Sequence, residues 1–131
     1  MIKILFICLG NICRSPMAEF VLKDMAARRG LASKFYIASA ATSAEELGNP
    51  VHRGTREKLR ACGISTAGKY AVQMKRQDYE DYDYLLGWRS EIFPICAGLP
   101  EAIRMGKCIG CSIFHQIPEI SQIPGIQAIL T

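Results

Sequence analysis

The sequence predicts an α/β fold, a doubly wound parallel sheet, in a single domain of 131 residues. The run KILFIC, residues 3–8, is continuously apolar, which is typical of a central parallel strand covered on both faces. Strand-like and helix-like segments then alternate as far as Gly87, in the order strand, helix, strand, helix, strand. This order favours parallel strands joined by right-handed crossovers.

The first predicted helix follows the first strand closely. Pro16 fits its first turn, and Ser15 is the expected N-cap. Apolar residues keep a helical spacing through MAEFVLKDMAARR, residues 17–29, and Gly30 is the expected C-terminal stop. The second strand is predicted in KFYIAS, residues 34–39.

The regular pattern resumes after a loop. A second helix is expected to open at Asn49 and Pro50, to run through HRGTREKLRAC (residues 52–62), and to close at Gly63. The segment DYLLG, residues 83–87, is predicted to form a third strand.

Composition excludes several classes of partner. The net charge is only +4, and the basic residues form no block, so nucleic acid is not an expected partner. The apolar N-terminus lacks the basic flank and cleavage site of a signal peptide, and no segment is expected to span a membrane. Six cysteines without an export signal indicate free thiols in the cytoplasm.

The segment CLGNICRS, residues 8–15, carries the chemistry. Cys8 ends a buried strand, a short loop containing Gly10 follows, and Arg14 stands at the mouth of a helix. Backbone N–H groups and the helix dipole can hold an anion in such a loop, and Arg14 can grip two phosphate oxygens. The same positive field favours the Cys8 thiolate, a nucleophile for in-line attack on phosphorus. A merely buried cysteine is the alternative, and the strand–loop–helix context favours the nucleophile.

The segment CLGNICRSPMAE resembles the signature of the low-molecular-weight protein tyrosine phosphatases. The similarity continues through SAATSAEELGNP, GIS…AVQM and DYDYLLG, over roughly residues 1–87. It implies hydrolysis of phosphotyrosine in proteins, or of small aryl phosphates, through a phosphocysteine on Cys8. Arg14 would bind the phosphate in the ground and transition states, and no metal or cofactor is expected.

The resemblance also implies roles for the rest of the loop. Asn11, Ser15 and Ser39 would hydrogen-bond the loop and hold its shape, and Ser15 would help the thiolate form and leave. Cys13 would capture oxidised Cys8 as a reversible disulfide. The implied substrate-binding residues are Leu9, Gly10, Asn11, Ile12, Cys13, Ser15 and Ser39.

Two positions bear on substrate preference. The related arginine phosphatases usually carry threonine where this chain has Ile12, so Ile12 favours phosphotyrosine over phosphoarginine on steric grounds. Glu45 stands where many members of the family place an aromatic residue of the cleft.

The C-terminal third departs from the family. Members place a general-acid aspartate in an Asp-Pro-aromatic-aromatic motif near the C-terminus, whereas this chain has no aspartate after Asp83. The family also expects Met-Asp after the third strand, where Trp88 follows Gly87 here. Residues 88–131 are therefore interpreted as a divergent tail on a family-like catalytic half, residues 1–87.

A change of reading frame explains this departure. Each shifted codon takes the third base of one residue's codon and the first two bases of the next. If the codon of Gly87 is GGA, a methionine codon then arises across Gly87 and Trp88. The same frame lets residues 121–131 encode Ile-Ala-Asp-Pro-Trp-Tyr-Thr-Gly-Asn-Phe-Asp, which contains the missing motif. The hypothesis is that residues 88–131 are a frameshift product, and that most of them are irregular.

Other functions stay open at this point. The C-x-x-C pair of Cys108 and Cys111, with Cys96 and His115, is weak evidence for zinc because a second such pair is absent. An arsenate reductase would use Cys8 to attack arsenate and Cys108 or Cys111 to resolve the product. A third alternative is an inactive remnant that only binds oxyanions, which requires no general acid.

Overall fold

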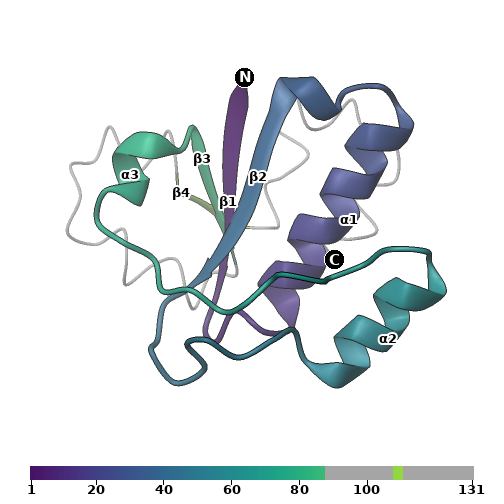
Figure 1. The fold of residues 1–131 in the computed structure, drawn as a ribbon. Coiled ribbons are helices and arrows are strands. Elements are labelled where there is room, and N and C mark those ends of the chain that lie inside the picture. The colour runs from purple at the N-terminus through teal and green to yellow at the C-terminus, as the bar shows by residue number, and fades with distance from the viewer. Residues whose placement is uncertain (88–107, 111–131) are drawn as a thin grey trace.

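The computed structural model describes residues 1–87 and 108–110, which form a parallel sheet with helices against it (Figure 1). The predicted alternation of strands and helices through Gly87 is confirmed. The elements in chain order are β1 (Ile2–Cys8), α1 (Arg14–Arg28), a 3-10 turn (Ala32–Lys34), β2 (Phe35–Ala41), α2 (Arg53–Ala61), α3 (Asp78–Asp81), β3 (Tyr84–Gly87) and β4 (Cys108–Gly110).

The strands lie in the order β2-β1-β3-β4, and all neighbours are parallel. The register places Leu5 of β1 between Ala38 of β2 and Leu85 of β3. Strand β1 is thus central, as its unbroken apolar run predicts. Because parallel strands share one carboxyl edge, Cys8 stands at that edge, where it pairs with Ala41 of β2.

Strand β4 lies beyond Gly87 and pairs with β3. These three residues continue the sheet, and they are compatible with the expectation that most, not all, of residues 88–131 are irregular. The rest of that expectation falls outside the described residues.

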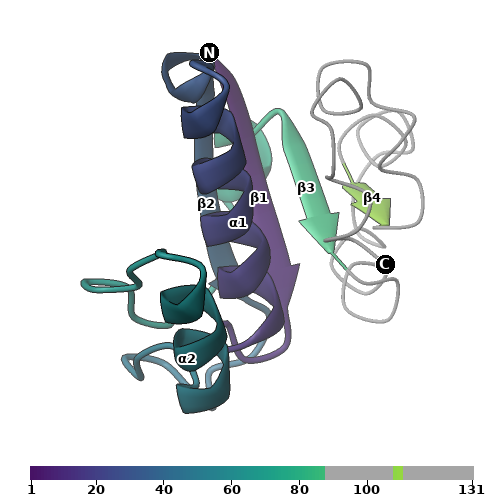
Figure 2. The same cartoon turned by 90° about the vertical axis from the view of Figure 1, so that its right-hand side faces the viewer.

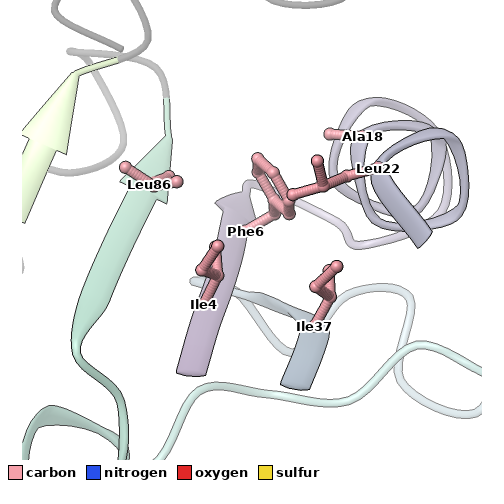
Figure 3. Packing of buried hydrophobic residues seen from close by; sticks show 6 residues of the cluster. All are labelled: Ile4, Phe6, Ala18, Leu22, Ile37 and Leu86. Atoms are coloured by element: carbon pink, nitrogen blue, oxygen red, sulfur yellow. The ribbon is translucent and has the colours of Figure 1, made fainter. Parts of the chain in front are cut away.

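One face of the sheet packs against α1. Figure 3 shows the side chains that meet there, and Figure 2 shows α1 running along the sheet. Side chains that alternate along β1 supply its centre, because successive residues of a strand point to opposite faces. The buried members of this cluster are Ile4, Phe6, Ala18, Leu22, Ile37 and Leu86.

The opposite face carries a second buried cluster. Leu5 and Ile7 of β1 belong to it, with Ala40 and Leu85 from the neighbouring strands. Part-buried Met74 and Tyr82 pack on it from the segment around α3. The core of β1 is thus covered on both faces, which holds the end of this strand in a fixed position.

Helix α1 ends as predicted but begins differently. Gly30 follows it in the left-handed conformation, at φ 69°, and the amide of Leu31 donates to the carbonyl of Ala26. The expected N-cap at Ser15 is wrong, because the helix begins at Arg14 and Cys13 precedes it. The Ser15 side chain faces the loop instead.

Helix α2 begins three residues later than expected. His52 is its N-cap, and the His52 Nδ1 atom accepts a hydrogen bond from the Gly54 amide at 3.2 Å. Pro50 is held outside the helix in an isolated antiparallel bridge with Tyr70. The predicted stop at Gly63 is confirmed, with φ 77°. Among the helices described, none is long and apolar enough to cross a membrane.

Candidate active site

The loop between β1 and α1 is anchored through its carbonyl groups. The amide of Thr42 donates to the Cys8 carbonyl at 3.0 Å, and the amide of His52 donates to the Ile12 carbonyl at 2.7 Å. The Ser43 amide and hydroxyl both donate to the Leu9 carbonyl. Because these carbonyls are bonded outward, to the segments after β2 and before α2, the loop is held by its neighbours on both sides.

The Cys8 thiol is buried at the base of this loop. Its Sγ atom lies 3.0 Å from the Ser15 hydroxyl and accepts a hydrogen bond from the Asn11 amide at 3.3 Å. Only 3% of Cys8 is exposed. The Asn11 amide and the Ser15 hydroxyl therefore converge on a sulfur atom at the carboxyl end of a central strand.

Asn11 holds the loop in its unusual shape. Its φ of 58° lies in the left-handed region, and it is the one non-glycine residue with positive φ in the part of the chain described. Its side-chain amide donates to Ser15 at 2.8 Å and to Ser39 at 2.9 Å. Its carbonyl oxygen accepts from the Val72 amide at 3.1 Å, which fixes the orientation of the amide group.

The hydrogen bonds around Asn11 have a single direction. The Glu19 carboxylate can only accept, so the Ser39 hydroxyl donates to it at 2.6 Å and accepts from Asn11. The other amide hydrogen of Asn11 goes to the Ser15 oxygen, which leaves the Ser15 hydroxyl hydrogen available for Cys8. When Cys8 is a thiolate, which can only accept, the Ser15 hydroxyl is the donor of this contact.

Glu19 and Lys69 are parts of this network that the sequence did not single out. Glu19 is 3% exposed, on the inner face of α1. Lys23 contacts its carboxylate at 2.7 Å and Lys69 at 3.4 Å, and Lys69 also donates to the Ser39 carbonyl at 3.0 Å. An acidic residue on a buried helix face was the available signal for Glu19, because such a residue needs a partner.

A small cavity of about 230 Å³ opens over the loop. Cys8 and Arg14 line it, as do Glu45 and Glu46 from the loop after β2. A side chain at Gly10 would bring its Cβ atom within 3.2 Å of the Glu46 Cγ atom, so glycine leaves room there. The predicted loop residues complete the lining: Leu9, Gly10, Asn11, Ile12 and Cys13. Ser15 and Ser39 lie behind the loop as its supports.

Cys13 faces α2 in this structure. Its Sγ atom lies 3.1 Å from the Thr55 hydroxyl, and Cys8, Cys13 and Cys62 are all free thiols. Thr55 is buried at the first turn of α2 and was not predicted as a neighbour of the loop. The contact ties the exposed second cysteine of the loop to that helix.

The model of one protein family, described as low molecular weight phosphotyrosine protein phosphatase, matches residues 3–107. The match contains β1, the Cys8 loop and α1, and it extends past Gly87, where the resemblance was expected to end. The chain belongs to the low molecular weight phosphotyrosine protein phosphatase family.

Relatives of known sequence belong to the same phosphatase family. The low molecular weight protein-tyrosine-phosphatase YfkJ of Bacillus subtilis is 50% identical over 91 residues, which cover 70% of this chain and 58% of YfkJ. The human low molecular weight phosphotyrosine protein phosphatase is 37% identical over 84 residues, 64% of this chain and 52% of the human protein. The matched part is thus little more than half the length of either relative.

Solved structures of phosphatases share the fold. The crystal structure of YfkJ from Bacillus subtilis has a TM-score of 0.80 at 34% identity and covers 99% of this chain and 87% of YfkJ. The structure of DARP, a Drosophila arginine phosphatase, has a TM-score of 0.77 at 25% identity and covers 98% of this chain and 88% of DARP. YfkJ is described as a tyrosine phosphatase and DARP as an arginine phosphatase, and both share this fold. The fold alone therefore does not select between the two substrates.

The remaining predictions on sites fall largely outside the described part. Within residues 1–87 and 108–110, no three His, Cys, Asp or Glu side chains gather where they could hold a metal ion. The side chains of Cys96, Cys108, Cys111 and His115 are not among the described ones, and neither is the segment that the shifted reading frame would replace.

Proposed function

We propose that this chain cleaves aryl phosphate monoesters, phosphotyrosine in proteins among them, with Cys8 as the nucleophile. The observation that carries the proposal is the pair of donors, the Asn11 amide and the Ser15 hydroxyl, that meet the Cys8 sulfur beneath the cavity. Membership of the phosphatase family supports the same reaction. Residues 1–87 supply the nucleophile and its supports, within what we take to be a single domain of 131 residues.

The first chemical step follows from this geometry. The Cys8 thiolate attacks phosphorus in line with the ester bond, an S–P bond forms, and the bond to the aryl oxygen breaks. Arg14 stands at the first position of α1 and lines the cavity, where its planar fork can hold two phosphoryl oxygens. Water then cleaves the S–P bond, inorganic phosphate leaves, and the Ser15 hydroxyl stabilises the returning thiolate.

The aryl oxygen leaves with a negative charge unless an acid protonates it. This chain has no aspartate after Asp83 and therefore lacks the family's general-acid motif. We propose that its turnover is reduced for this reason, by the roughly 10²–10⁴-fold that general acid catalysis contributes. Binding of an oxyanion in the Cys8 loop needs no general acid.

The test is to trap the intermediate. The full chain is mixed with ³²P-labelled p-nitrophenyl phosphate, quenched in acid, and mapped by mass spectrometry for a phosphoryl group on Cys8. Phosphocysteine in the wild type and none in Cys8→Ser is the expected result. Binding of vanadate without a phosphoenzyme would identify a remnant that binds oxyanions only.

The same chain is then assayed with arsenate and a thiol reductant. The proposed phosphatase should release phosphate from aryl phosphates without consuming reductant. Arsenate-dependent oxidation of the thiol, with no phosphate release from any aryl ester, would replace the proposal with an arsenate reductase.

A further inference from the structure

A second cavity, of about 470 Å³, lies between α2 and the segment from Gly63 to Tyr70. It shares no lining residue with the cavity over the Cys8 loop. In Figure 1 this segment runs back from the end of α2 toward the sheet. Its volume is within the range of cavities that take small molecules.

Positive charge converges on this cavity. Arg56 and Arg60 of α2 and Lys69 line it, and none of its lining residues is a carboxylate. Neither arginine forms an ion pair with any residue of the described part. By contrast, Arg53 on the same helix pairs with Glu57 at 3.0 Å. The two arginine side chains thus line the cavity without a carboxylate of the described part to pair with.

Hydroxyl groups add further donors. Ser65 and Thr66 line the same cavity, and the Ser65 oxygen accepts a hydrogen bond from the Ala67 amide at 3.2 Å, which leaves its hydroxyl hydrogen free to donate. Tyr70 stands half-exposed at the lining. The cavity thus offers cations and hydroxyl donors, a donor set that suits an anion.

We propose that this cavity binds a small multivalent anion. Two arginines and a lysine that line one cavity suit a ligand with two or more anionic groups, because each guanidinium can hold one phosphate or carboxylate bidentately. Diphosphates and polycarboxylates share this chemistry.

Lys69 couples the cavity to the active site. Its side chain is 14% exposed, lines the cavity, and lies 3.4 Å from the Glu19 carboxylate. A bound anion competes with Glu19 for this cation. Glu19 is the acceptor at the end of the network that runs through Ser39 and Asn11 to Cys8. With Lys69 drawn toward the ligand, the negative charge of Glu19 is less compensated, which disfavours the Cys8 thiolate.

Binding is tested by calorimetric titration with inorganic pyrophosphate and, separately, with citrate. Both titrations use the full chain carrying Arg14→Ala, so that the Cys8 loop binds anions less tightly. Adding Arg56→Gln and Arg60→Gln should weaken binding at least about tenfold, the equivalent of one charge-assisted contact. The matched control adds Arg53→Gln and Lys58→Gln, which remove the same charge from the same helix outside the cavity.

Binding of pyrophosphate alone identifies a phosphate ligand, and binding of citrate alone identifies a carboxylate ligand. An equal loss in both double variants would show a general charge effect and overturn the site, as would no binding of either probe. Circular dichroism confirms that each variant is folded.

Coupling is read from the rate at which neutral iodoacetamide alkylates Cys8, followed by peptide mass spectrometry in the same Arg14→Ala background. Saturating anion should slow this rate about fivefold, the lower end of typical coupling between sites. The effect should vanish in Lys69→Gln. An unchanged alkylation rate at saturation, or an effect that survives Lys69→Gln, would overturn the coupling.

Discussion

The Ser15 hydroxyl lies 3.0 Å from the Cys8 sulfur, across the loop that joins β1 to α1. The same oxygen accepts from Asn11, and its own hydrogen is available to donate to the Cys8 sulfur when that sulfur is a thiolate. Its position explains why Ser15 does not cap the helix that begins beside it: the side chain is turned back over the loop. The predictions below test this loop and its supports.

Replacing Cys8 with serine should abolish aryl phosphatase activity and leave the fold intact. A hydroxyl is far less acidic than a thiol, so the donors around position 8 cannot supply an ionised nucleophile. We expect a loss of at least about three orders of magnitude in kcat, as for nucleophiles of other covalent enzymes. Vanadate affinity, measured by calorimetry, should persist. Wild-type turnover in the variant would remove Cys8 from the chemistry.

Arg14→Lys should be severely impaired although it keeps the charge. An ammonium group is a point donor and cannot replace the planar fork that meets two phosphoryl oxygens. We expect kcat/KM for p-nitrophenyl phosphate to fall by about 10²–10³, similar to the loss of one oxyanion donor elsewhere. The matched control is Arg53→Lys on the surface of α2, which should change nothing. Near-normal kinetics in Arg14→Lys would exclude Arg14 from the transition state.

Substitutions at Asn11 should separate backbone strain from hydrogen bonding. Asn11→Ala loses the contacts to Ser15, Ser39 and Val72 and keeps a Cβ atom at φ 58°. We expect it to lower the free energy of unfolding by on the order of 3 kcal/mol, because buried partners are left unpaired. Asn11→Gly loses the same contacts without the left-handed penalty, and should be more stable than the alanine variant by about 1 kcal/mol.

Urea denaturation measures both Asn11 variants. Equal stability of the two would show that the left-handed backbone carries no strain here. Both should lose phosphatase activity, since neither can orient Ser15 toward Cys8.

The acidity of the leaving phenol should determine how fast this chain cleaves an aryl phosphate. If this chain acts without the family's general acid, as proposed, esters of strongly acidic phenols should be cleaved faster than phosphotyrosine by a wide margin, because their oxygen leaves without a proton. A plot of log kcat/KM against leaving-group pKa across substituted aryl phosphates should therefore be steeply negative. A flat plot would show that another residue serves as the acid.

Restoring the alternative reading frame after Gly87 should raise activity. With suitable third bases, the shifted frame can encode an aspartate before proline, tryptophan and tyrosine in the segment now occupied by residues 121–131. A chain that joins residues 1–87 to this translation should gain about 10²–10⁴-fold on phosphotyrosine peptides. The same chain with that aspartate changed to asparagine is the control. No gain over the present sequence would contradict the frameshift hypothesis, as would resequencing across the Gly87 codon that confirms the present frame.

The strands and the nucleophile loop were accessible from sequence because their signals are local. A continuous apolar run predicts β1. Cys8, Gly10 and Arg14 all lie within the short segment of residues 8–15. Glu19 and Lys69 were not accessible in this way. Their ion pair joins α1 to a loop fifty residues later, and only the packing of the two segments shows it.

The start of α2 shows a second limit of sequence reasoning. Asn49 and Pro50 are good helix openers by local preference, yet Pro50 is held in a bridge with Tyr70. The carbonyl of Asn49 likewise accepts from Ala71. Pairing with a segment twenty residues away outcompetes local propensity, so His52 takes the capping role.

The bond from the Val72 amide to the Asn11 side chain has a consequence for how the protein matures. Asn11 is synthesised sixty-one residues before the amide that orients it. Because contacts between distant segments form late, a nascent chain that ends before Val72 carries Cys8 but lacks the anchored loop. If the anchored loop raises the reactivity of the Cys8 thiol, as the proposed function requires, that reactivity reports when the loop has folded. In a series of ribosome-bound fragments, rapid alkylation at Cys8 should begin only after Val72 has left the exit tunnel.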